Sequence, residues 1–515
     1  MKVLYFLILF ISSIWSREIT LSEIESYPKG YARDFYIWQF LQQNVSKDQK
    51  ERAYNLVHRS TWRIDKYFPE KSNPCDVKIS EMPKMCITPR FLSNNSSGIA
   101  KYFMQKHFEK DEKIEYLTKS FYYKQSMTKT LYKYPEIYLD IFLGIAPQKR
   151  KDVRIDTELS PNFLRGLQKD KNRFEKFVAT VLAYGNFHKI KKSFLELEPS
   201  KNISGKALLR LAYFYIQKGL EDKAFQFFKV ADEVAYYQEY KDEAKFWMFM
   251  LSNDKKYLEK LVKSWDINIY TIYAHETLGK KIDGYLSGVD LAEKGEIDLD
   301  SSNPFQWQKF LHSISKNSSD EILKLAEKFK NKNQWEIYYY LMQRGNRYRI
   351  QSFPTELQKY MVGENLDLQA ILLAISRQES RFIPSVISIA YALGSMQMMP
   401  FLVDDIAKNR GEKIEYEDMF QFKKSVEYSL HHLKDLKRSF DHPLLIAYAY
   451  NAGASYAKRV KRQKFKEGKY EPFLSLETLT YGETRKYGKK VLANYIIFKR
   501  LLGEDTSLHK VLEKL

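Results

Sequence analysis

The chain has 515 residues, a length that predicts roughly two to four domains at about 150 residues each. Hydrophobic residues make up 44% of the sequence and aromatic residues 15%, which excludes a wholly disordered protein. It has only 20 glycines and 15 prolines, so an all-α fold is favoured over an all-β fold with many tight turns. The net charge of +20 favours an acidic partner: nucleic acid, an anionic membrane or an acidic polymer.

Residues 1–16 have the pattern of a secretory signal peptide, with Lys2 before an apolar run over 3–14 and cleavage expected after Ser16. This run is shorter than the roughly 18 apolar residues that favour a membrane-spanning helix, and no later segment is apolar enough to span a membrane. We therefore expect a soluble, exported, periplasmic protein with no stable membrane span.

The chain has two cysteines, Cys75 and Cys86, and after export we expect them to form one disulfide that closes a short loop. Two free thiols are the alternative. No His or acidic residues stand at matched spacing, so we expect no metal site there. The sequence also lacks zinc-finger, helix-turn-helix and RNA-recognition patterns, so we expect no nucleic-acid partner.

Residues 17–345 repeat apolar positions at helical spacing, separated by short polar breaks. The clearest unit, Lys206–Tyr237, has the pattern of a tetratricopeptide-like helical hairpin with its turn at Lys218-Gly219. Its apolar stripes are Ala207, Leu211 and Tyr215 before the turn and Ala224, Phe227 and Ala231 after it. One hairpin cannot bury its own apolar face, so an α-superhelical domain is expected. The pattern changes near 345–362, where we place a domain boundary before residues 346–515.

A single acidic residue interrupts an apolar helix stripe in residues 365–382. Its apolar positions are Leu368, Ile371, Leu372 and Ile375, and Glu379 falls on the same face at the C-terminal end. Desolvation and the helix dipole would both raise the pKa of this carboxyl, as a general acid requires. Two alternatives stay open from this helix alone: the helix ends before Glu379, or Arg377 or Arg381 pairs with it.

Three more motifs follow: S-I-A-Y-A-L-G-S-M-Q-M-M-P at 388–400, A-Y-N-A-G at 449–453 and E-T-R-K-Y at 483–487. With R-Q-E-S at 377–380, their order resembles the soluble lytic transglycosylases of glycoside hydrolase family 23, strongly over 350–500 and weakly upstream. The resemblance implies an α-superhelix of U- and L-type subdomains, followed by a lysozyme-like, mainly helical catalytic domain.

The resemblance also implies an activity, in which Glu379 is the single general acid/base. It protonates the glycosidic oxygen between N-acetylmuramic acid and N-acetylglucosamine, then deprotonates the muramic C6 hydroxyl, which closes a 1,6-anhydro ring. Glycosidases ordinarily use two carboxylates; here the substrate supplies the nucleophile. Asp404, Asp405 and Glu412 lie downstream, and a helper role for one of them stays open. No metal or cofactor is needed.

Substrate-binding positions are implied residue by residue at Ser388, Gln397, Met399, Tyr450, Asn451 and Glu483. Ser388 matches the position near the N-acetyl group, and Tyr450 the hydroxyl that points toward the catalytic carboxylate. Glu483 matches an acid that helps to hold the stem peptide, or else it bridges to Arg485. Core packing is the safer expectation for the methionines in general. The implied partners are peptidoglycan glycan strands and stem peptides, with possible cell-wall enzyme partners and a monomeric state.

Some positions depart from the family motifs. Tyr391 stands where glycine is usual and could narrow a subsite or shift the loop, and Ser395 replaces an apolar residue. His431 and His432 form a pair that we expect at the surface rather than in a metal site. Two rival functions also remain: a hydrolytic muramidase on the same fold, and a cell-wall scaffold protein with a weak catalytic domain.

Overall fold

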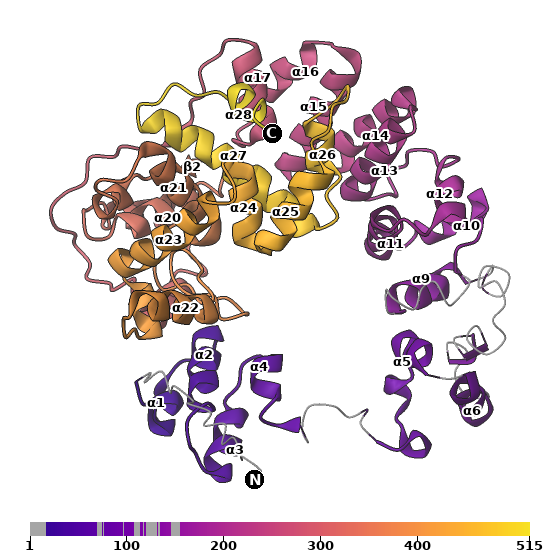
Figure 1. The fold of residues 1–515 in the computed structure, drawn as a ribbon, viewed down its shortest axis with the longest axis horizontal. Helices are drawn as coiled ribbons and strands as arrows, with labels where there is room; N and C mark the ends of the chain where they lie inside the picture. Colours follow the sequence, from indigo (N-terminus) through magenta and orange to yellow (C-terminus); the bar gives the residue numbers. More distant parts are fainter. Residues whose placement is uncertain are drawn as a thin grey trace, which may run out of the picture. The chain divides into compact units, whose positions relative to one another are not determined.

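The computed structural model describes residues 17–69, 75, 77–95, 97–107, 114–116, 118–119, 131, 134–145 and 155–515. The expected signal peptide, residues 1–16, lies outside them. Helices form nearly all the regular structure of the described residues (Figure 1), and β1 (Tyr285–Leu286) pairs in parallel with β2 (Gln351–Ser352). The all-α prediction is confirmed.

The described residues fall into two compact units, each assembled from separated segments of the chain. The first takes its residues from 1–70, 283–457 and 490–507, and the second from 71–282, 458–489 and 508–515. The first unit contains residues on both sides of 345–362. The division into compact units therefore does not test the predicted boundary there, which stays a prediction.

The helices of the first unit are α1 (Leu21–Ser26), α2 (Tyr31–Phe40), α3 (Lys47–Asn55), α4 (Trp62–Asp65), α18 (Pro304–Ser313), α19 (Ser319–Glu327), α20 (Trp335–Gly345), η5 (Glu356–Tyr360), α21 (Leu366–Ser380), α22 (Pro400–Arg410), η6 (Tyr416–Phe420), α23 (Phe422–Lys437) and α24 (Pro443–Ala452). Those of the second are η2 (Ile79–Glu81), η3 (Lys84–Cys86), α5 (Pro89–Asn94), α6 (Ser97–His107), α9 (Pro135–Gly144), α10 (Pro161–Leu167), α11 (Lys171–Ala183), α12 (His188–Phe194), α13 (Gly205–Gln217), α14 (Glu221–Val234), α15 (Gln238–Ser252), α16 (Lys256–Leu261), α17 (Ile269–Thr277), α26 (Phe473–Glu477) and α28 (Leu508–Leu512). Two helices contribute residues to both units: α25 (Ala454–Gln463) and α27 (Gly482–Leu501).

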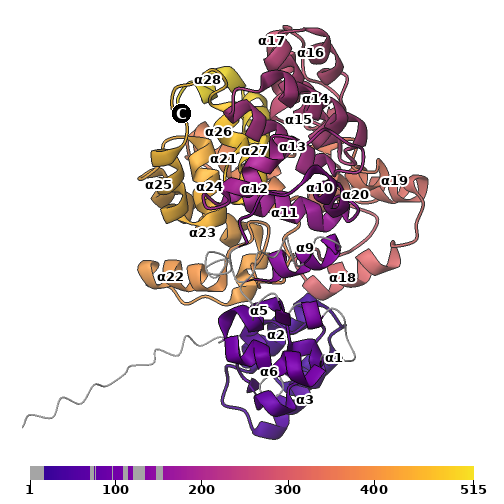
Figure 2. The same ribbon diagram turned by 90° about the vertical axis from the view of Figure 1, so that its right-hand side faces the viewer.

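The predicted helical hairpin is present as α13 and α14, joined by a turn in which Gly219 has φ +72°. A positive φ suits glycine because it has no Cβ. The six stripe residues are all fully buried: Ala207, Leu211, Tyr215, Ala224, Phe227 and Ala231. Their partners are one another and the neighbouring helices, since α11 packs on α13 and α15 packs on α14 (Figures 1 and 2). Stacked helices thus bury the faces that one hairpin would leave exposed.

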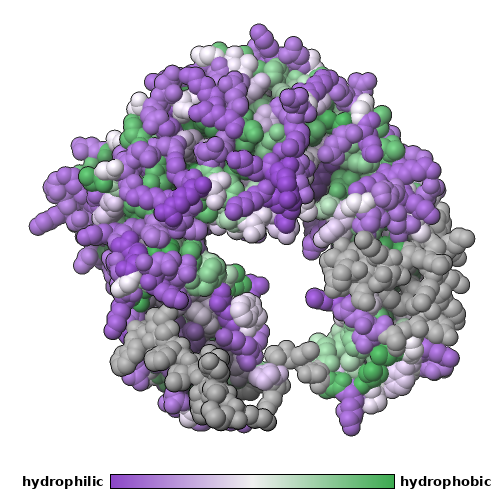
Figure 3. All heavy atoms as spheres, in the orientation of Figure 1, coloured by the Kyte–Doolittle hydropathy of each residue, from purple (hydrophilic) through white to green (hydrophobic). Residues whose placement is uncertain are grey.

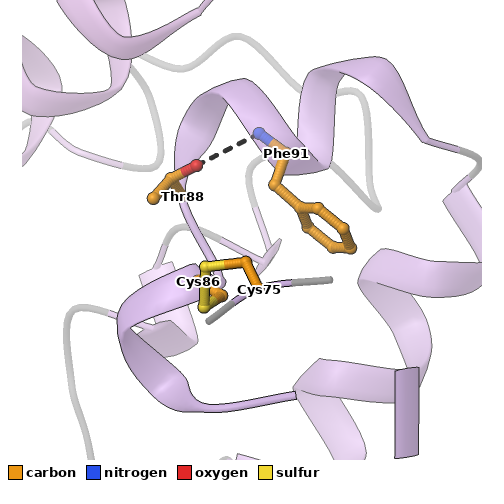
Figure 4. Close-up of a disulfide and its surroundings, with 4 residues drawn as sticks. All are labelled: Cys75, Cys86, Thr88 and Phe91. Atoms are coloured by element: carbon orange, nitrogen blue, oxygen red, sulfur yellow. Dashed lines mark hydrogen bonds between the residues drawn. A yellow bond between two sulfur atoms is a disulfide. The ribbon is translucent and has the colours of Figure 1, made fainter. Parts of the chain in front are cut away.

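Cys75 and Cys86 form the expected disulfide, with their Cα atoms 5.4 Å apart (Figure 4). The bond closes an eleven-residue separation just before α5. The α5 helix begins at a threonine cap, where Thr88 Oγ1 accepts a hydrogen bond from the Phe91 amide at 3.2 Å. The disulfide therefore holds the chain two residues before Thr88, the N-cap of α5, in the second unit.

Among the coloured residues of Figure 3, hydrophilic side chains predominate, with smaller hydrophobic patches between them. Across the described residues, no helix combines the length and the apolar character needed to cross a membrane.

Glu336 is a buried acid on α20 whose ionisation should make stability depend on pH. It is 1% exposed, Ser301 donates to one carboxylate oxygen, and Oε2 has no hydrogen-bond partner among the described residues. Burial raises the pKa of this carboxyl to about 7. Between pH 4.5 and about 7 the folded protein keeps this proton whereas the unfolded chain releases it, so stability falls as pH rises through this window.

Glu336→Gln should remove this component of the pH dependence, which amounts to about 3 kcal/mol over the window. Thermal melting of the parent and the variant from pH 4.5 to 8 checks it. The variant should gain stability relative to the parent as pH rises, and a constant difference between the two would contradict the assignment.

Candidate active site

Glu379 lies in the last turn of α21, the helix on which the sequence placed it. The helix begins at Asn365, whose side-chain oxygen accepts from the Leu368 amide at 2.8 Å, and it ends at Arg381, which has φ +53°. The alternative that the helix ends before Glu379 is therefore wrong. The apolar stripe that precedes Glu379 is buried, and Glu379 itself is half-buried. Its carboxylate thus stands at the edge of the core, at the negative end of the helix dipole.

Both neighbouring arginines have partners elsewhere in the first unit. Arg377 donates to the Ser352 carbonyl at 2.7 Å and to Gln351 Oε1 at 2.8 Å, and its guanidinium lies 4.0 Å from the centre of a phenylalanine ring. The Arg381 guanidinium lies 4.7 Å from the centre of the Tyr348 ring. These contacts tie the C-terminal end of α21 to β2 and to the segment before it.

Residues 383–399 follow α21 and fold back onto it. Main-chain carbonyl groups of this segment accept the hydrogen bonds that hold it in place. Ser380 Oγ donates to the Ser395 carbonyl at 2.8 Å, so the serine next to Glu379 holds the segment against the helix. The amides of Leu393 and Met398 bond to each other's carbonyls at 2.9 and 3.0 Å, which closes a tight loop. The backbone of this loop is thereby fixed beside Glu379.

Two of the implied substrate-binding residues brace this loop. Ser388 Oγ accepts from the Ala392 amide at 2.9 Å. The side-chain amide of Gln397 donates to the carbonyls of Val386 and Gly394, both at 2.9 Å. Ser388 and Gln397 are each half-buried, so they retain surface for contact with a ligand.

Gly394 is required at the turn of this loop. It has φ +77°, and an added Cβ would lie 2.1 Å from the Met419 carbonyl oxygen, which is backbone and cannot move aside. Gly394→Ala should therefore displace the loop, lower the free energy of unfolding by at least about 1–2 kcal/mol and reduce activity.

Melting temperature and activity together check this prediction. Gly411→Ala is a matched control, because Gly411 also has a positive φ (+66°) but has open space around its Cβ position. Equal effects of the two substitutions would show that backbone strain alone is responsible and would contradict the proposed clash.

Tyr450 completes the cluster from α24. Its hydroxyl donates to the Met396 carbonyl at 2.7 Å, which links α24 to the loop. Burial and the nearby Glu379 carboxylate raise the pKa of Tyr450, so its phenol stays protonated and can serve as the donor in this hydrogen bond. The first unit therefore brings together one carboxylate, one phenol and a braced loop from three separate segments.

Core packing was the expectation for the methionines in general, and two of the three in this loop meet it. Met396 and Met398 are 0% and 1% exposed and belong to the core. Met399 is half-buried and caps the start of α22. Asn451 is half-buried in the last turn of α24, next to Tyr450.

His432 has a closer relation to this site than the sequence suggested. Its ring centre lies 5.5 Å from that of Tyr450, and burial lowers the pKa of the imidazole. His432 is half-buried, as is His431, so the expectation of a surface pair stays a prediction. Nε2 of His431 lies 3.6 Å from Asp435. No group of three or more His, Cys, Asp or Glu side chains suited to a metal ion occurs in the described ranges.

Tyr391 departs from the family motif without lining an open subsite. Its side chain is fully buried, and its ring centre lies 5.4 Å from that of Trp38 on α2. Its hydroxyl lies 3.4 Å from Thr61 Oγ1, just before α4. Because it has φ +64°, the tyrosine turns out of the loop and packs on the N-terminal helices of its own unit. The other departure, Ser395, is also buried, and its carbonyl accepts the Ser380 hydroxyl.

Two of the three acids downstream of Glu379 have structural partners of their own. Asp404 accepts from the Tyr416 hydroxyl at 2.9 Å, and burial raises its pKa. Glu412 accepts from Lys424 at 3.1 Å and pairs with Arg410, and these hydrogen bonds lower its pKa to about 2. Asp405 is exposed.

Glu483 lies outside the cluster, in the second unit. It is exposed in the first turn of α27. Arg485 donates instead to the Glu477 carbonyl at 2.8 Å, and Glu483 forms no ion pair within the part of the chain that the structure describes. The suggested bridge between Glu483 and Arg485 is therefore absent there.

Comparison with known proteins identifies the same region. Residues 357–473 match the family model of the Transglycosylase SLT domain. The chain is 24% identical over 306 residues to the soluble lytic murein transglycosylase of Salmonella typhimurium, which covers 52% of this chain and 45% of that protein. It is 22% identical over 310 residues to the Escherichia coli K12 protein of the same name, covering 53% and 46%. The chain thus spans less than half the length of these curated relatives.

Solved structures extend the likeness of fold over most of the chain. The 70 kDa soluble lytic transglycosylase Slt70 of E. coli matches with a TM-score of 0.55 at 15% identity, covering 94% of this chain and 83% of that one. An inactive mutant of the lytic transglycosylase Slt of Pseudomonas aeruginosa matches with a TM-score of 0.55 at 14% identity, covering 95% and 85%. The chain is therefore similar in fold to soluble lytic transglycosylases, and residues 357–473 match their SLT domain.

Proposed function

We propose that the protein is an exported lytic transglycosylase that cleaves the β-1,4 bond between N-acetylmuramic acid and N-acetylglucosamine in peptidoglycan. The observation that carries this proposal is the position of Glu379 at the end of a buried helix stripe, beside Tyr450 and the braced loop of the SLT domain. The curated relatives act on murein by name, which supports the same substrate class.

Glu379 would act as the single general acid/base. In its protonated form it gives its proton to the glycosidic oxygen as the bond from muramic C1 to that oxygen breaks. The carboxylate then takes the proton of the muramic C6 hydroxyl while the C6 oxygen bonds to C1, which closes the 1,6-anhydro ring. Water is neither consumed nor released, so the enzyme needs no second carboxylate to activate it. The helix dipole at the end of α21 disfavours the charged carboxylate and so favours the acid form that starts the reaction.

The other site residues would position the sugar. Ser388 and Gln397 hold the loop, and their half-buried side chains would contact the substrate. Met399 is half-buried at the end of the loop, and Asn451 is half-buried next to Tyr450 on α24. Tyr450 would orient the carboxylate and the muramic ring. Glu483 would contact the stem peptide from α27. No metal or cofactor takes part in these steps, and we propose that the protein acts as a monomer.

Solubilisation of purified peptidoglycan by the chain from residue 17 onward tests the proposal. The expected result is steady release of soluble muropeptides, and no release would favour the scaffold function instead.

Tyr450→Phe should lower this rate about 10- to 100-fold, because the loop loses its hydrogen bond at Met396 and the reacting groups shift. Tyr456→Phe is a matched control, since Tyr456 is buried on α25, the next helix along the chain. Equal rates for Tyr450→Phe and the parent would exclude Tyr450 from the reaction.

A further inference from the structure

The second unit contains a cavity of 420 Å³ with a strongly cationic lining. Its walls come from α11, from α13 and from the segment around α26 and the start of α27. Five basic side chains line it: Lys191, Arg210, Lys218, Lys464 and Arg485. None of the cluster around Glu379 is among its lining residues.

The hydrogen bonds of these basic groups go to neutral oxygens. Lys191 donates to the Tyr184 carbonyl at 2.8 Å, and Lys464 donates to the Thr478 hydroxyl at 3.0 Å. Arg485 donates to a main-chain carbonyl. Within the described ranges none of the five forms an ion pair, and Arg210 makes no hydrogen bond. A partly buried guanidinium without a partner is costly and is best satisfied by an anion.

The one acid in the lining does not neutralise these charges. Glu477 is 1% exposed, and its carboxylate is bound to Lys489 at 2.6 Å and to the Tyr270 hydroxyl. Four further carboxylates act on the basic groups from a distance: Glu175 and Glu243 on Arg210, Asp156 on Lys191, and Glu471 on Lys464. Glu175 itself accepts from Ser204 at 2.8 Å. The cavity therefore keeps an excess of positive charge.

The basic groups repel one another. Burial lowers the pKa of Arg210, and the neighbouring Arg485 lowers it further. Burial and Lys218 act in the same way on Lys191. Burial also lowers the pKa of Lys464. A bound anion would relieve both the desolvation and the repulsion.

The two guanidinium groups of the lining, those of Arg210 and Arg485, both lie near one point of the wall. A Cβ placed on Gly482 would lie 3.7 Å from Nη2 of Arg210 and 4.0 Å from Nη2 of Arg485. Gly482 is also the first residue of α27, a twenty-residue helix whose N-terminal amides add positive potential at the same point. Two planar donors beside a helix N-terminus match the two oxygens of a carboxylate.

We propose that this cavity binds an acidic peptide with two or more carboxylates, in the form of the stem peptide of peptidoglycan. The identity of the peptide rests on the proposed function. The apolar side chains of Leu182, Phe214 and Leu479 supply contacts for its alkyl groups, whereas a small inorganic anion would leave them uncovered. The volume suits a ligand of a few residues. This cavity would bind peptide carboxylates as a site separate from the cluster around Glu379.

Binding is tested with free stem peptides released from purified peptidoglycan by an amidase, so that no sugar can occupy a glycan site. The protein is the Glu379→Gln variant of the whole chain, which separates binding from turnover. Calorimetric titrations compare these peptides, the same peptides with their carboxylates amidated, and inorganic phosphate. The variants are Arg210→Met, Lys218→Glu and a control, Lys229→Gln, an exposed residue of α14 outside the cavity.

The expected result is saturable binding of the free peptides that weakens at least tenfold in Arg210→Met and Lys218→Glu, with Lys229→Gln unchanged. Amidated peptides and phosphate should bind at least tenfold more weakly. Lys218 is exposed, so its variant reports on binding even if Arg210→Met does not fold. Equal binding by all variants, or phosphate binding without peptide binding, would overturn the proposal. These outcomes do not depend on which products the active enzyme releases, so this proposal and the proposed function can fail separately.

Discussion

Glu379→Gln should lower the rate of peptidoglycan solubilisation by at least about 1000-fold without unfolding the protein. Glutamine keeps the shape of the side chain in the last turn of α21 but can neither donate nor accept the proton that both steps require. The measurement is the rate of release of soluble muropeptides, with melting temperature as a check on the fold.

Glu412→Gln is the matched control, because Glu412 was a candidate helper and has Arg410 and Lys424 as structural partners. It should act near the parent rate. If both variants were inactive, the account with a single carboxylate would be contradicted, and if both were active, Glu379 would not be the catalytic residue.

Lys489→Met should lower the free energy of unfolding by about 3–5 kcal/mol. Lys489 is 5% exposed, and its ammonium lies 2.6 Å from Glu477 Oε2 and 2.9 Å from Glu243 Oε2. The Tyr270 hydroxyl lies 2.6 Å from the same nitrogen. Methionine has a similar length but no charge, so two buried carboxylates would lose the cation between them. The carboxylates of Glu243 and Glu477 raise the pKa of Lys489, so its ammonium group stays charged at neutral pH.

Thermal and urea unfolding measure this effect, with Lys458→Met as the control at an exposed lysine of the second unit. Adding Glu477→Gln to Lys489→Met should restore part of the lost stability, because it removes one of the two uncompensated charges. Burial and the adjacent Glu243 already raise the pKa of Glu477 to about 7. A neutral glutamine should therefore be tolerated better at Glu477 than at a carboxyl with an ordinary pKa. A Lys489→Met variant as stable as the control would show that the cluster contributes little.

The sequence predicted what depends on local spacing. The 3.6-residue period placed Glu379 on the stripe of α21 and identified α13 and α14 as a hairpin, because each pattern lies within one helix or one pair. The short separation of Cys75 and Cys86 likewise predicted their disulfide. Three of the four ordered motifs, at 377–380, 388–400 and 449–453, lie together in the first unit, whereas the fourth, at 483–487, lies in the second.

Contacts between distant parts of the chain could not be predicted. Glu477 on α26 comes from a part of the chain far from Glu243 on α15 and Tyr270 on α17, and these polar groups have no periodic signature. The same holds for the contact of Tyr391 with Trp38. The cationic cavity could not be predicted either, because basic residues are expected all over the surface of a lysine-rich chain.

His432 shows the same limit within the candidate site. It stands three residues after Ser429, whose side chain hydrogen-bonds to Tyr450, and this spacing puts both residues on one face of α23. That face could be assigned to the site only once α24 was known to bring Tyr450 against it. The adjacent His431, on a different face, made a surface pair the simpler interpretation.

Mass spectrometry of muropeptides released in ¹⁸O-labelled water tests the central claim most directly. A lytic transglycosylase forms the anhydro ring within the substrate, so the products should be one water lighter than hydrolysis products, lack a reducing end and carry no ¹⁸O. Glu379→Gln should release none of them. Reducing-end products that carry one ¹⁸O would instead show that the enzyme hydrolyses the bond, and they would contradict the account.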